Sequence, residues 1–225
     1  MDECSFHPPS FRWVWAPSQR PEPGGMEETV LTDPFDYAAE DRLIDAWQRT
    51  IANMPPVPFA TETPEQLGRR TVVLETTLGN ITIGFDAQQA PEHVRNFLQL
   101  AQAGVLDGTP FHRVVRGFVV QAGSVAHRSA PLTEKQQKFV RNLQPEFNDT
   151  KHVKGIVSMA RGDDPASAST SFFIVTADAP SLDGKYTVFG RVIDGLDVLD
   201  KIEATPVSGE SPTTRIDLVK VRVVG

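Results

Sequence analysis

Apolar and β-branched residues recur in two short runs around a turn sequence near residue 78. The runs are 71–76 (TVVLET) and 81–85 (ITIGF), and Leu78-Gly79-Asn80 between them is typical of a tight turn. This pattern predicts a β-hairpin.

Two later stretches have the spacing of amphipathic helices instead. The first begins at Pro91, a residue favoured in the first helical turn, and ends at Gly104, a typical C-terminal cap. Its apolar positions, spaced i, i+3, i+4, i+7, are Val94, Phe97, Leu98 and Ala101. The second is shorter, covers residues 195–202, and has Leu196, Leu199 and Ile202 on one face.

Short apolar runs fill the rest of the C-terminal two thirds. These runs are 111–115, 118–121, 155–159, 172–176 and 187–192, followed by a closing run at 215–224. Many short strands with two helices, without regular alternation of strand and helix, predict a mainly β fold: a closed antiparallel barrel whose ends are covered by the two helices.

The first quarter of the chain differs in composition. Residues 1–64 contain ten of the 18 prolines and eleven Asp and Glu against four Lys and Arg, whereas the remainder carries 18 of each charge. The net charge of −7 therefore lies entirely in this segment. We predict a disordered leader at 1–35, an amphipathic helix with a Pro-rich linker at 36–68, and one folded domain at 69–225.

The helix of the extension is indicated by apolar residues four positions apart. Leu43, Trp47 and Ile51 share one face, and acidic residues occupy the first turns, where the helix dipole favours them. A lone amphipathic helix is marginal in water, so this helix either packs on the body of its own chain or docks on a partner.

Composition limits the class of protein. Hydrophobic residues make up 40% and charged residues 23%, which is ordinary for a globular chain, and no run approaches the roughly 18–20 apolar residues that span a bilayer. The N-terminus lacks a basic start followed by an apolar segment, and the single cysteine, Cys4, allows no internal disulfide. We expect a cytoplasmic protein that is not a membrane protein. The balanced charge of residues 65–225 disfavours nucleic acid as a partner.

Common enzyme signatures are absent from the sequence. The five histidines lie at positions 7, 93, 112, 127 and 152 and lack metal-ligand spacing, and no GxSxG, GxGxxG or phosphate-binding GxxxxGK[ST] motif occurs. We expect neither a metal nor a cofactor.

Three separate segments carry the most specific signal. They are FHRVVRGFVVQAG at 111–123, SMAR at 158–161 with SFFI at 171–174, and LDGKY at 182–186 with VFGRV at 188–192. Together and in this order they resemble the cyclophilin family of peptidyl-prolyl cis-trans isomerases, and most of all its bacterial branch. The resemblance covers about residues 70–225 and implies an eight-stranded antiparallel barrel capped by two helices.

The resemblance also assigns roles to residues. It makes Arg113 the catalytic group, because a guanidinium stays charged in an apolar setting and can hydrogen-bond the prolyl nitrogen of a twisted peptide bond. Gln121 either orients Arg113 or holds the substrate carbonyl, and the backbone of Ala160 and Arg161 pairs with an extended peptide. The proline slot that it implies consists of Phe118, Val119, Phe173 and Leu182, with Tyr186 at its edge.

The sequence departs from the best-known eukaryotic members at four positions in these three segments or beside them. Val119 replaces methionine, Ser171 replaces a substrate-binding glutamine, Ser181 replaces tryptophan and Tyr186 replaces histidine. The loss of the tryptophan predicts weak binding of cyclosporin, and the short Ser171 side chain predicts looser positioning of the substrate.

The resemblance therefore implies an enzyme that accelerates rotation of X-Pro bonds in peptides and folding chains. Two alternatives use the same pocket: a non-catalytic module that binds proline peptides, and a chaperone that holds unfolded chains. Retention of Arg113 favours the enzyme.

Overall fold

The computed structural model describes residues 37–52 and 56–225 and divides the chain into two units, 1–54 and 55–225. Helix α1 (Tyr37–Ala52) belongs to the first unit and agrees with the helix expected within residues 36–68. Its Leu43, Ile44 and Trp47 side chains are exposed. The leader at 1–35 and the Ile51 side chain lie outside the described residues, so the docking of α1 stays a prediction.

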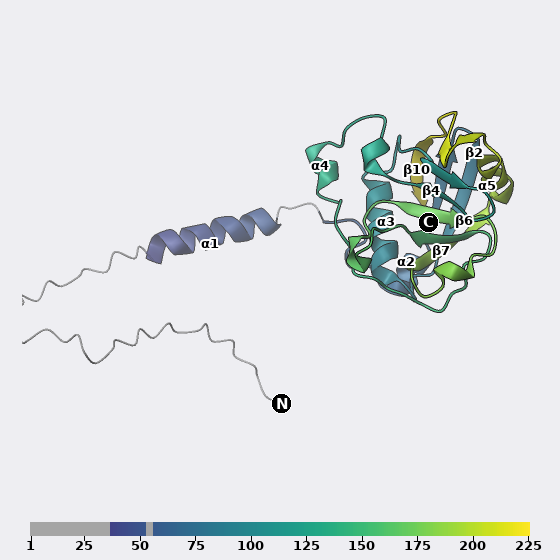
Figure 1. Ribbon diagram of the computed structural model, residues 1–225. Coiled ribbons are helices and arrows are strands. Elements are labelled where there is room, and N and C mark those ends of the chain that lie inside the picture. The colour runs from purple at the N-terminus through teal and green to yellow at the C-terminus, as the bar shows by residue number, and fades with distance from the viewer. Residues whose placement is uncertain (1–36, 53–55) are drawn as a thin grey trace, which may run out of the picture. The chain divides into compact units, whose positions relative to one another are not determined.

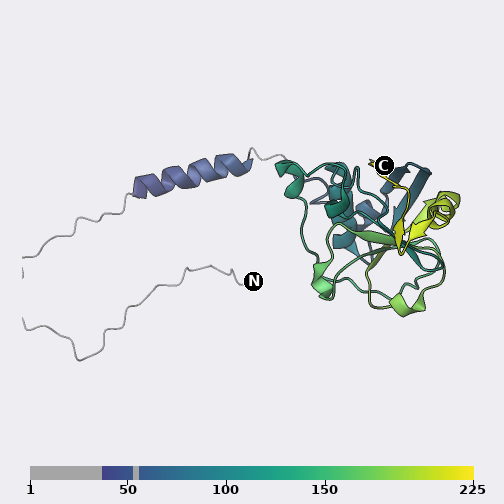
Figure 2. The same cartoon turned by 45° about the horizontal axis from the view of Figure 1, so that its top comes forward.

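The second unit is built on an eight-stranded antiparallel sheet with the order β10-β1-β2-β7-β5-β6-β4-β3. Figures 1 and 2 show this sheet curled, with helices at its margins. Its strands are β1 (Thr71–Thr76), β2 (Gly79–Phe85), β3 (Arg113–Val115), β4 (Val119–Ala122), β5 (Ile156–Met159), β6 (Phe172–Val175), β7 (Val188–Asp194) and β10 (Leu218–Val224). The predicted hairpin at 71–85 is β1 paired with β2.

The two ends of this sheet meet through the residues just before β3. Pro110 forms a bridge with Asp217, the Phe111 amide donates to the Ile216 carbonyl at 2.8 Å, and the Gly108 amide donates to the Leu218 carbonyl at 2.7 Å. Closure satisfies backbone groups that an open edge would leave unpaired, and it confirms the predicted antiparallel barrel.

Both helices expected from the sequence are present. They are α3 (Pro91–Gln102), which is followed by Gly104 at φ +65°, and α5 (Leu196–Glu203). The sequence analysis missed the shorter elements α2 (Pro64–Gly68), α4 (Glu134–Gln137), the 3₁₀ turns η1 (Val125–His127), η2 (Pro165–Ser167) and η3 (Pro180–Leu182), and a ribbon of β8 (Val207–Ser208) and β9 (Ser211–Pro212). Such short pieces leave too few residues for a periodic pattern.

The start of α3 is stabilised by a carboxylate that is distant in sequence. Ala90 at the N-cap provides no side-chain acceptor, and Glu146 instead accepts hydrogen bonds from the amides of Glu92 (3.1 Å) and His93 (2.9 Å) and from the His93 ring (2.6 Å). Burial raises the pKa of Glu146, but these hydrogen bonds outweigh burial and hold it below its usual value. Glu146 thus satisfies amides that a helix start leaves open.

The stretch expected to be a linker contains structure that packs on the barrel. Thr63 and Gln66 form a reciprocal capping box at the start of α2, and Leu67 is fully buried in the main core. Gln99 of α3 donates to the Pro58 carbonyl at 3.0 Å. Residues 58–68 therefore pack on the barrel.

Apolar side chains form two clusters, one on each face of β4, β5 and β6. Inside the barrel, Val120, Val157 and Ile174 belong to the main core. On the outer face a smaller cluster contains Val119, Ile156, Phe173, Val175, Ala179, Leu182 and Val188, with Phe118, Ala160 and Tyr186 packed against it. These strands carry apolar side chains on both faces, so their sequences are mainly apolar and lack a strict alternation with polar residues.

Candidate active site

The candidate site lies on the outer face of β3, β4 and β6. Strand register places Arg113 opposite Gln121, and Gln121 opposite Phe173. Directly paired residues point to the same face about 5 Å apart. A guanidinium, an amide and an aromatic ring thus form one row across three strands, although Phe173 is 60 positions from Arg113 in the sequence.

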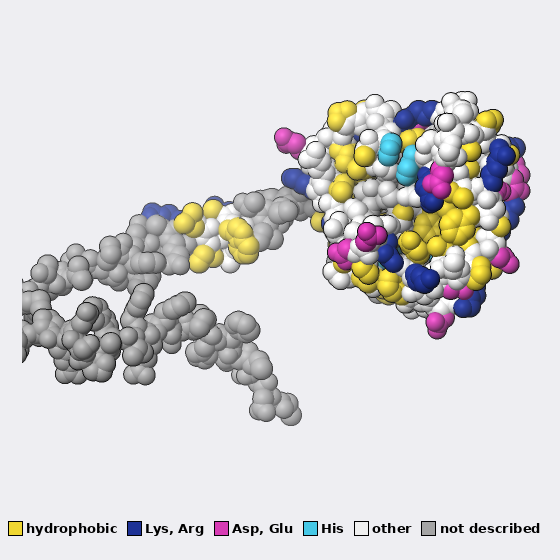
Figure 3. Space-filling view, in the orientation of Figure 1, with side chains coloured by type: hydrophobic (Ala, Val, Ile, Leu, Met, Phe, Trp, Pro, Cys, Tyr) yellow, Lys and Arg dark blue, Asp and Glu magenta, His cyan; other side chains and the backbone are white. Residues whose placement is uncertain are grey.

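A small cavity opens beside this row. Its volume is about 140 Å³. In the space-filling view, the body shows an apolar patch with basic, acidic and histidine side chains at its margin (Figure 3). The residues that line the cavity are Arg113, Phe118, Val119, Gln121, Ala160, Arg161, Phe173, Leu182 and Tyr186. Apart from Ser171, these are all the site residues expected from the sequence.

Aromatic contacts fix one wall of the cavity. The rings of Phe173 and Tyr186 meet edge to face, with centroids 5.4 Å apart and an interplanar angle of 85°. The Arg161 guanidinium lies over the Tyr186 ring at 4.8 Å from its centroid, in a cation–π contact. Arg161 also donates to the Lys185, Gly162 and Asp163 carbonyls at 2.8–3.2 Å. Its side chain is therefore part of the wall, a role that the sequence analysis did not give it.

A series of polar side chains centred on the buried His152 supports Phe173. The His152 ring bonds Asp183 through Nδ1 at 3.1 Å and the Ser158 hydroxyl through Nε2 at 3.0 Å, and it stacks on Phe173 at 6.1 Å. Hydrogen bonds from the His152 amide and ring, outweighing the effect of burial, and then from Lys151, lower the pKa of Asp183. Because Asp183 follows Leu182 in sequence, these contacts link Leu182 to Phe173, and both residues line the cavity. The sequence analysis missed His152 and Asp183, since they share no motif spacing.

The guanidinium of Arg113 is held by a residue that the sequence analysis also missed. Its Nε donates to one carboxylate oxygen of Glu210 at 2.6 Å and its Nη2 to the other at 3.2 Å. Two roles were left open for Gln121: to orient Arg113 or to hold the substrate carbonyl. Among the described residues, no hydrogen bond joins the Gln121 side chain to Arg113, so no contact supports the first role.

Ser171 does not line the proline-sized cavity. It lines an adjacent one of about 200 Å³, which shares Gln121, Ala160 and Arg161 with the first. The Ser171 carbonyl accepts from the Ala160 amide at 2.9 Å, so that amide is already paired. Among the described residues, no hydrogen bond uses the Ala160 carbonyl or the Arg161 amide, and these remain for an extended peptide.

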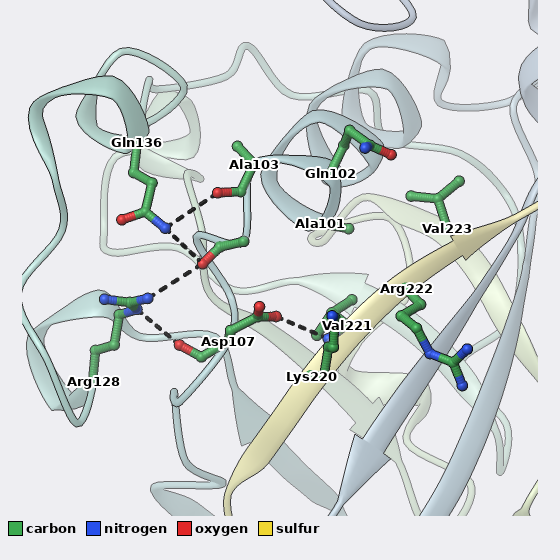
Figure 4. Close-up of a pocket in the computed structure, with 11 residues that line it drawn as sticks. Ala101, Gln102, Ala103, Asp107, Arg128, Gln136, Lys220, Val221, Arg222 and Val223 are labelled. Atoms are coloured by element: carbon green, nitrogen blue, oxygen red, sulfur yellow. Dashed lines mark hydrogen bonds between the residues drawn. The ribbon is translucent and has the colours of Figure 1, made fainter.

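A larger cavity of about 570 Å³ lies elsewhere, between the end of α3 and β10 (Figure 4). Several of its polar side chains are used within the fold: Arg128 donates to the Asp107 carbonyl at 2.8 Å, and Gln136 donates to the Ala103 and Gly104 carbonyls at 3.1 and 3.0 Å. The Asp107 carboxylate accepts from the Val221 amide at 2.9 Å. The arrangement holds a loop against the barrel, so the candidate site remains the smaller cavity.

Sequence comparison decides the family. The sequence model described as cyclophilin type peptidyl-prolyl cis-trans isomerase/CLD matches residues 71–223. The chain belongs to this family. Peptidyl-prolyl cis-trans isomerase CYP23 of Arabidopsis thaliana is 41% identical over 160 residues, which cover 68% of this chain and 71% of that protein. Peptidyl-prolyl cis-trans isomerase-like 1 of Neurospora crassa is 36% identical over 68% of this chain and 93% of that protein.

A bacterial cyclophilin relative is as similar as the fungal one. A probable peptidyl-prolyl cis-trans isomerase of Brucella abortus is 36% identical over 139 residues, covering 59% of this chain and 71% of that protein. The comparisons show the family, and the plant, fungal and bacterial relatives do not separate its branches.

Solved cyclophilins share the fold. A cyclophilin-type isomerase of Cryptosporidium parvum, crystallised in the presence of the dipeptide Ala-Pro, matches with a TM-score of 0.62 and 27% identity over 69% of this chain and 99% of that chain. Cyclophilin AquaCyp293 of Hirschia baltica matches with a TM-score of 0.59 and 26% identity over 68% of this chain and 73% of that chain. Within the described residues, no helix has the length and apolar character needed to cross a membrane.

Proposed function

We propose that this cyclophilin accelerates cis-trans isomerisation of X-Pro bonds in peptides and folding chains, with Arg113 as its catalytic residue. The observation that carries the proposal is the row of Arg113, Gln121 and Phe173 beside a cavity large enough for one five-membered ring. Family membership and the likeness to a protein crystallised with Ala-Pro support the substrate class.

The chemistry requires only a change in hydrogen bonding. Amide resonance sets a rotation barrier of about 18–20 kcal/mol, and the lone pair of the prolyl nitrogen localises as the bond twists. An N–H of Arg113 can donate to that nitrogen in the twisted state but not in either planar one. An interaction confined to the transition state lowers the barrier directly.

The other residues bind the substrate. Phe118, Val119, Phe173, Leu182 and Tyr186 surround the proline ring. Val119, Phe173 and Leu182 are buried, so the ring packs against an apolar surface. Gln121 holds the substrate carbonyl with its unpaired amide. The Ala160 carbonyl and Arg161 amide pair with the peptide backbone, and Ser171 contacts the residues before proline from the adjacent cavity.

NMR exchange on a short X-Pro peptide tests the proposal without a coupling protease. The wild-type chain accelerates exchange, and Arg113→Ala lowers the acceleration by about 10²–10³, the effect of removing one preorganised donor. Unfolding curves of both proteins control for folding. Peptide binding without any acceleration by the wild-type chain would instead identify a proline-binding module, and suppression of aggregation that survives Arg113→Ala would identify a holding activity.

The finer assignments remain part of the proposal. Ser181 and Tyr186 support a bacterial type of pocket with weak cyclosporin binding. The presence of one cysteine, Cys4, supports a reducing compartment, namely the cytoplasm. The exposed face of α1 supports docking, either on its own barrel or on a partner. Neutral charge balance in residues 65–225 continues to disfavour nucleic acid.

A further inference from the structure

We propose that Glu210 is a positioning residue for isomerisation: it holds the Arg113 guanidinium so that its free N–H groups face the proline cavity. The inference rests on the proposed function. It deepens that function by assigning a role to a residue 97 positions away from Arg113 in the sequence.

The pair has the two-pronged geometry that fixes a guanidinium plane. Nε and Nη2 each donate to a different oxygen of Glu210, at 2.6 and 3.2 Å. An arginine side chain has five N–H groups, and this contact uses two of them. Among the described residues no other hydrogen bond of the Arg113 side chain is found, so both Nη1 hydrogens and one on Nη2 remain for a substrate.

The Glu210 carboxylate lies outside the lining of the proline cavity. Arg113 lines the proline cavity, whereas Glu210 is not among the residues that line it. Glu210 therefore does not compete for the space of the proline ring. It occupies the Nε edge of the guanidinium and leaves the Nη1 group without a partner among the described residues.

Backbone hydrogen bonds fix the position of Glu210. Ser208 pairs with Ser211, which makes Gly209 and Glu210 the two-residue turn of the β8–β9 ribbon, and Gly209 has φ +64°, a conformation that glycine adopts without strain. The Glu210 carbonyl accepts from the Val114 amide of β3 at 2.7 Å. The turn is thus docked on the strand that carries Arg113.

Arg113 needs such a partner because a long arginine side chain can adopt many rotamers. Its side chain is 36% exposed and has several rotatable bonds, and solvent would otherwise leave it many conformations. The hydrogen bond from Arg113 lowers the pKa of Glu210 despite an opposing effect of burial, which keeps the carboxylate charged and the pair formed at neutral pH.

Kinetics of Glu210→Ala and Glu210→Gln test the inference in the full chain. We expect Glu210→Ala to lower kcat for a short X-Pro peptide on the order of tenfold, with little change in KM, as for coupled neighbours, and Glu210→Gln to recover part of the loss through its remaining carbonyl. A matched control is Glu75→Gln, which changes another carboxylate–arginine pair, formed by the half-buried Glu75 of β1 with Arg222 of β10. This control should leave kcat and KM unchanged.

Two further measurements distinguish positioning from a general loss of structure. In the Arg113→Ala background, Glu210→Ala should cause no additional loss, because the residue acts only through Arg113. The ¹H–¹⁵N signal of the Arg113 Nε–H should shift in Glu210→Ala, and its exchange with water should accelerate, whereas the melting temperature stays within the change seen for Glu75→Gln.

Results that contradict the role of Glu210 differ from results that contradict the proposed function. Unchanged or faster turnover by Glu210→Ala, an equal loss in the Arg113→Ala background, or an unaltered Nε–H signal would each overturn the positioning role while leaving the proposed function in place. Absence of acceleration by the wild-type chain would overturn the proposed function, and the kinetic role of Glu210 with it.

Discussion

Arg113 and Arg161 line the same cavity, but the fold holds them in opposite ways. Arg161 makes four hydrogen bonds to backbone carbonyls and lies over Tyr186, so nearly all of its donors are used. Arg113 is held along one edge by a single carboxylate. An arginine whose donors are spent on the backbone shapes a wall, whereas one held along a single edge keeps donors for a substrate.

The largest effect that tests this comparison is expected from Arg113→Lys. Lysine keeps the charge but loses the planar fork, so it cannot bind Glu210 with two prongs and still present a fixed donor to the prolyl nitrogen. We expect kcat/KM to fall on the order of 10², close to the effect of removing one preorganised donor. NMR exchange measures this value, and retention of near wild-type activity by the lysine variant would show that charge alone suffices.

A smaller effect is expected when the other arginine is changed. Arg161→Met retains much of the apolar stem but removes the cation–π contact with Tyr186, worth about 0.5–2 kcal/mol, and the carbonyl hydrogen bonds. We therefore expect KM to rise about fivefold with kcat nearly unchanged, because the wall loosens and the catalytic donor stays in place. Peptide titration followed by NMR measures binding separately. A fall in kcat without a change in KM would contradict the division of roles between the arginines.

The sequence identified Arg113 but not the residues that support the site from distant segments. Arg113, Phe118 and Gln121 lie within nine residues of one motif, so the family resemblance identified them together, and the register of β3 and β4 places Arg113 opposite Gln121. Glu210 and His152 reach the site through a ribbon and a loop that have no periodic pattern. Their contacts join residues that are distant in the sequence, Glu210 with Arg113 and His152 with Asp183, which no local window of sequence contains.

The same distinction holds for the fold. The helices α3 and α5 and the main strands have amphipathic or continuous apolar patterns long enough to predict their type. In contrast, α2 has five residues and only one buried side chain, Leu67, inside a segment whose prolines indicate an extended linker. Its capping box and tertiary contacts outweigh that local preference.

The smallest expected effect is that of pH on the free energy of unfolding, and the groups involved differ between the two sides of the cavity. Beside Arg113, the His112 ring stacks on His127 with centroids 4.8 Å apart. Burial, followed by the positive charges of His127 and Arg113, lowers the pKa of His112 in spite of an opposing backbone hydrogen bond. On the Arg161 side, the lowered pKa belongs to the carboxylate of Asp183, which titrates at lower pH.

The sign of the effect follows from proton binding. The unfolded chain protonates His112 near pH 6.5, whereas the folded chain protonates it only at lower pH, so the free energy of unfolding decreases as the pH falls below about 6.5. Glu146 and Glu210, whose pKa values are also lowered, contribute such losses only below about pH 4.5. We therefore expect His112→Gln to reduce the loss of stability between pH 7.5 and 5.5, measured by urea unfolding. His127→Gln should reduce it less, because burial is the larger cause and remains. An unchanged slope in His112→Gln would show that the stacked pair carries no charge penalty.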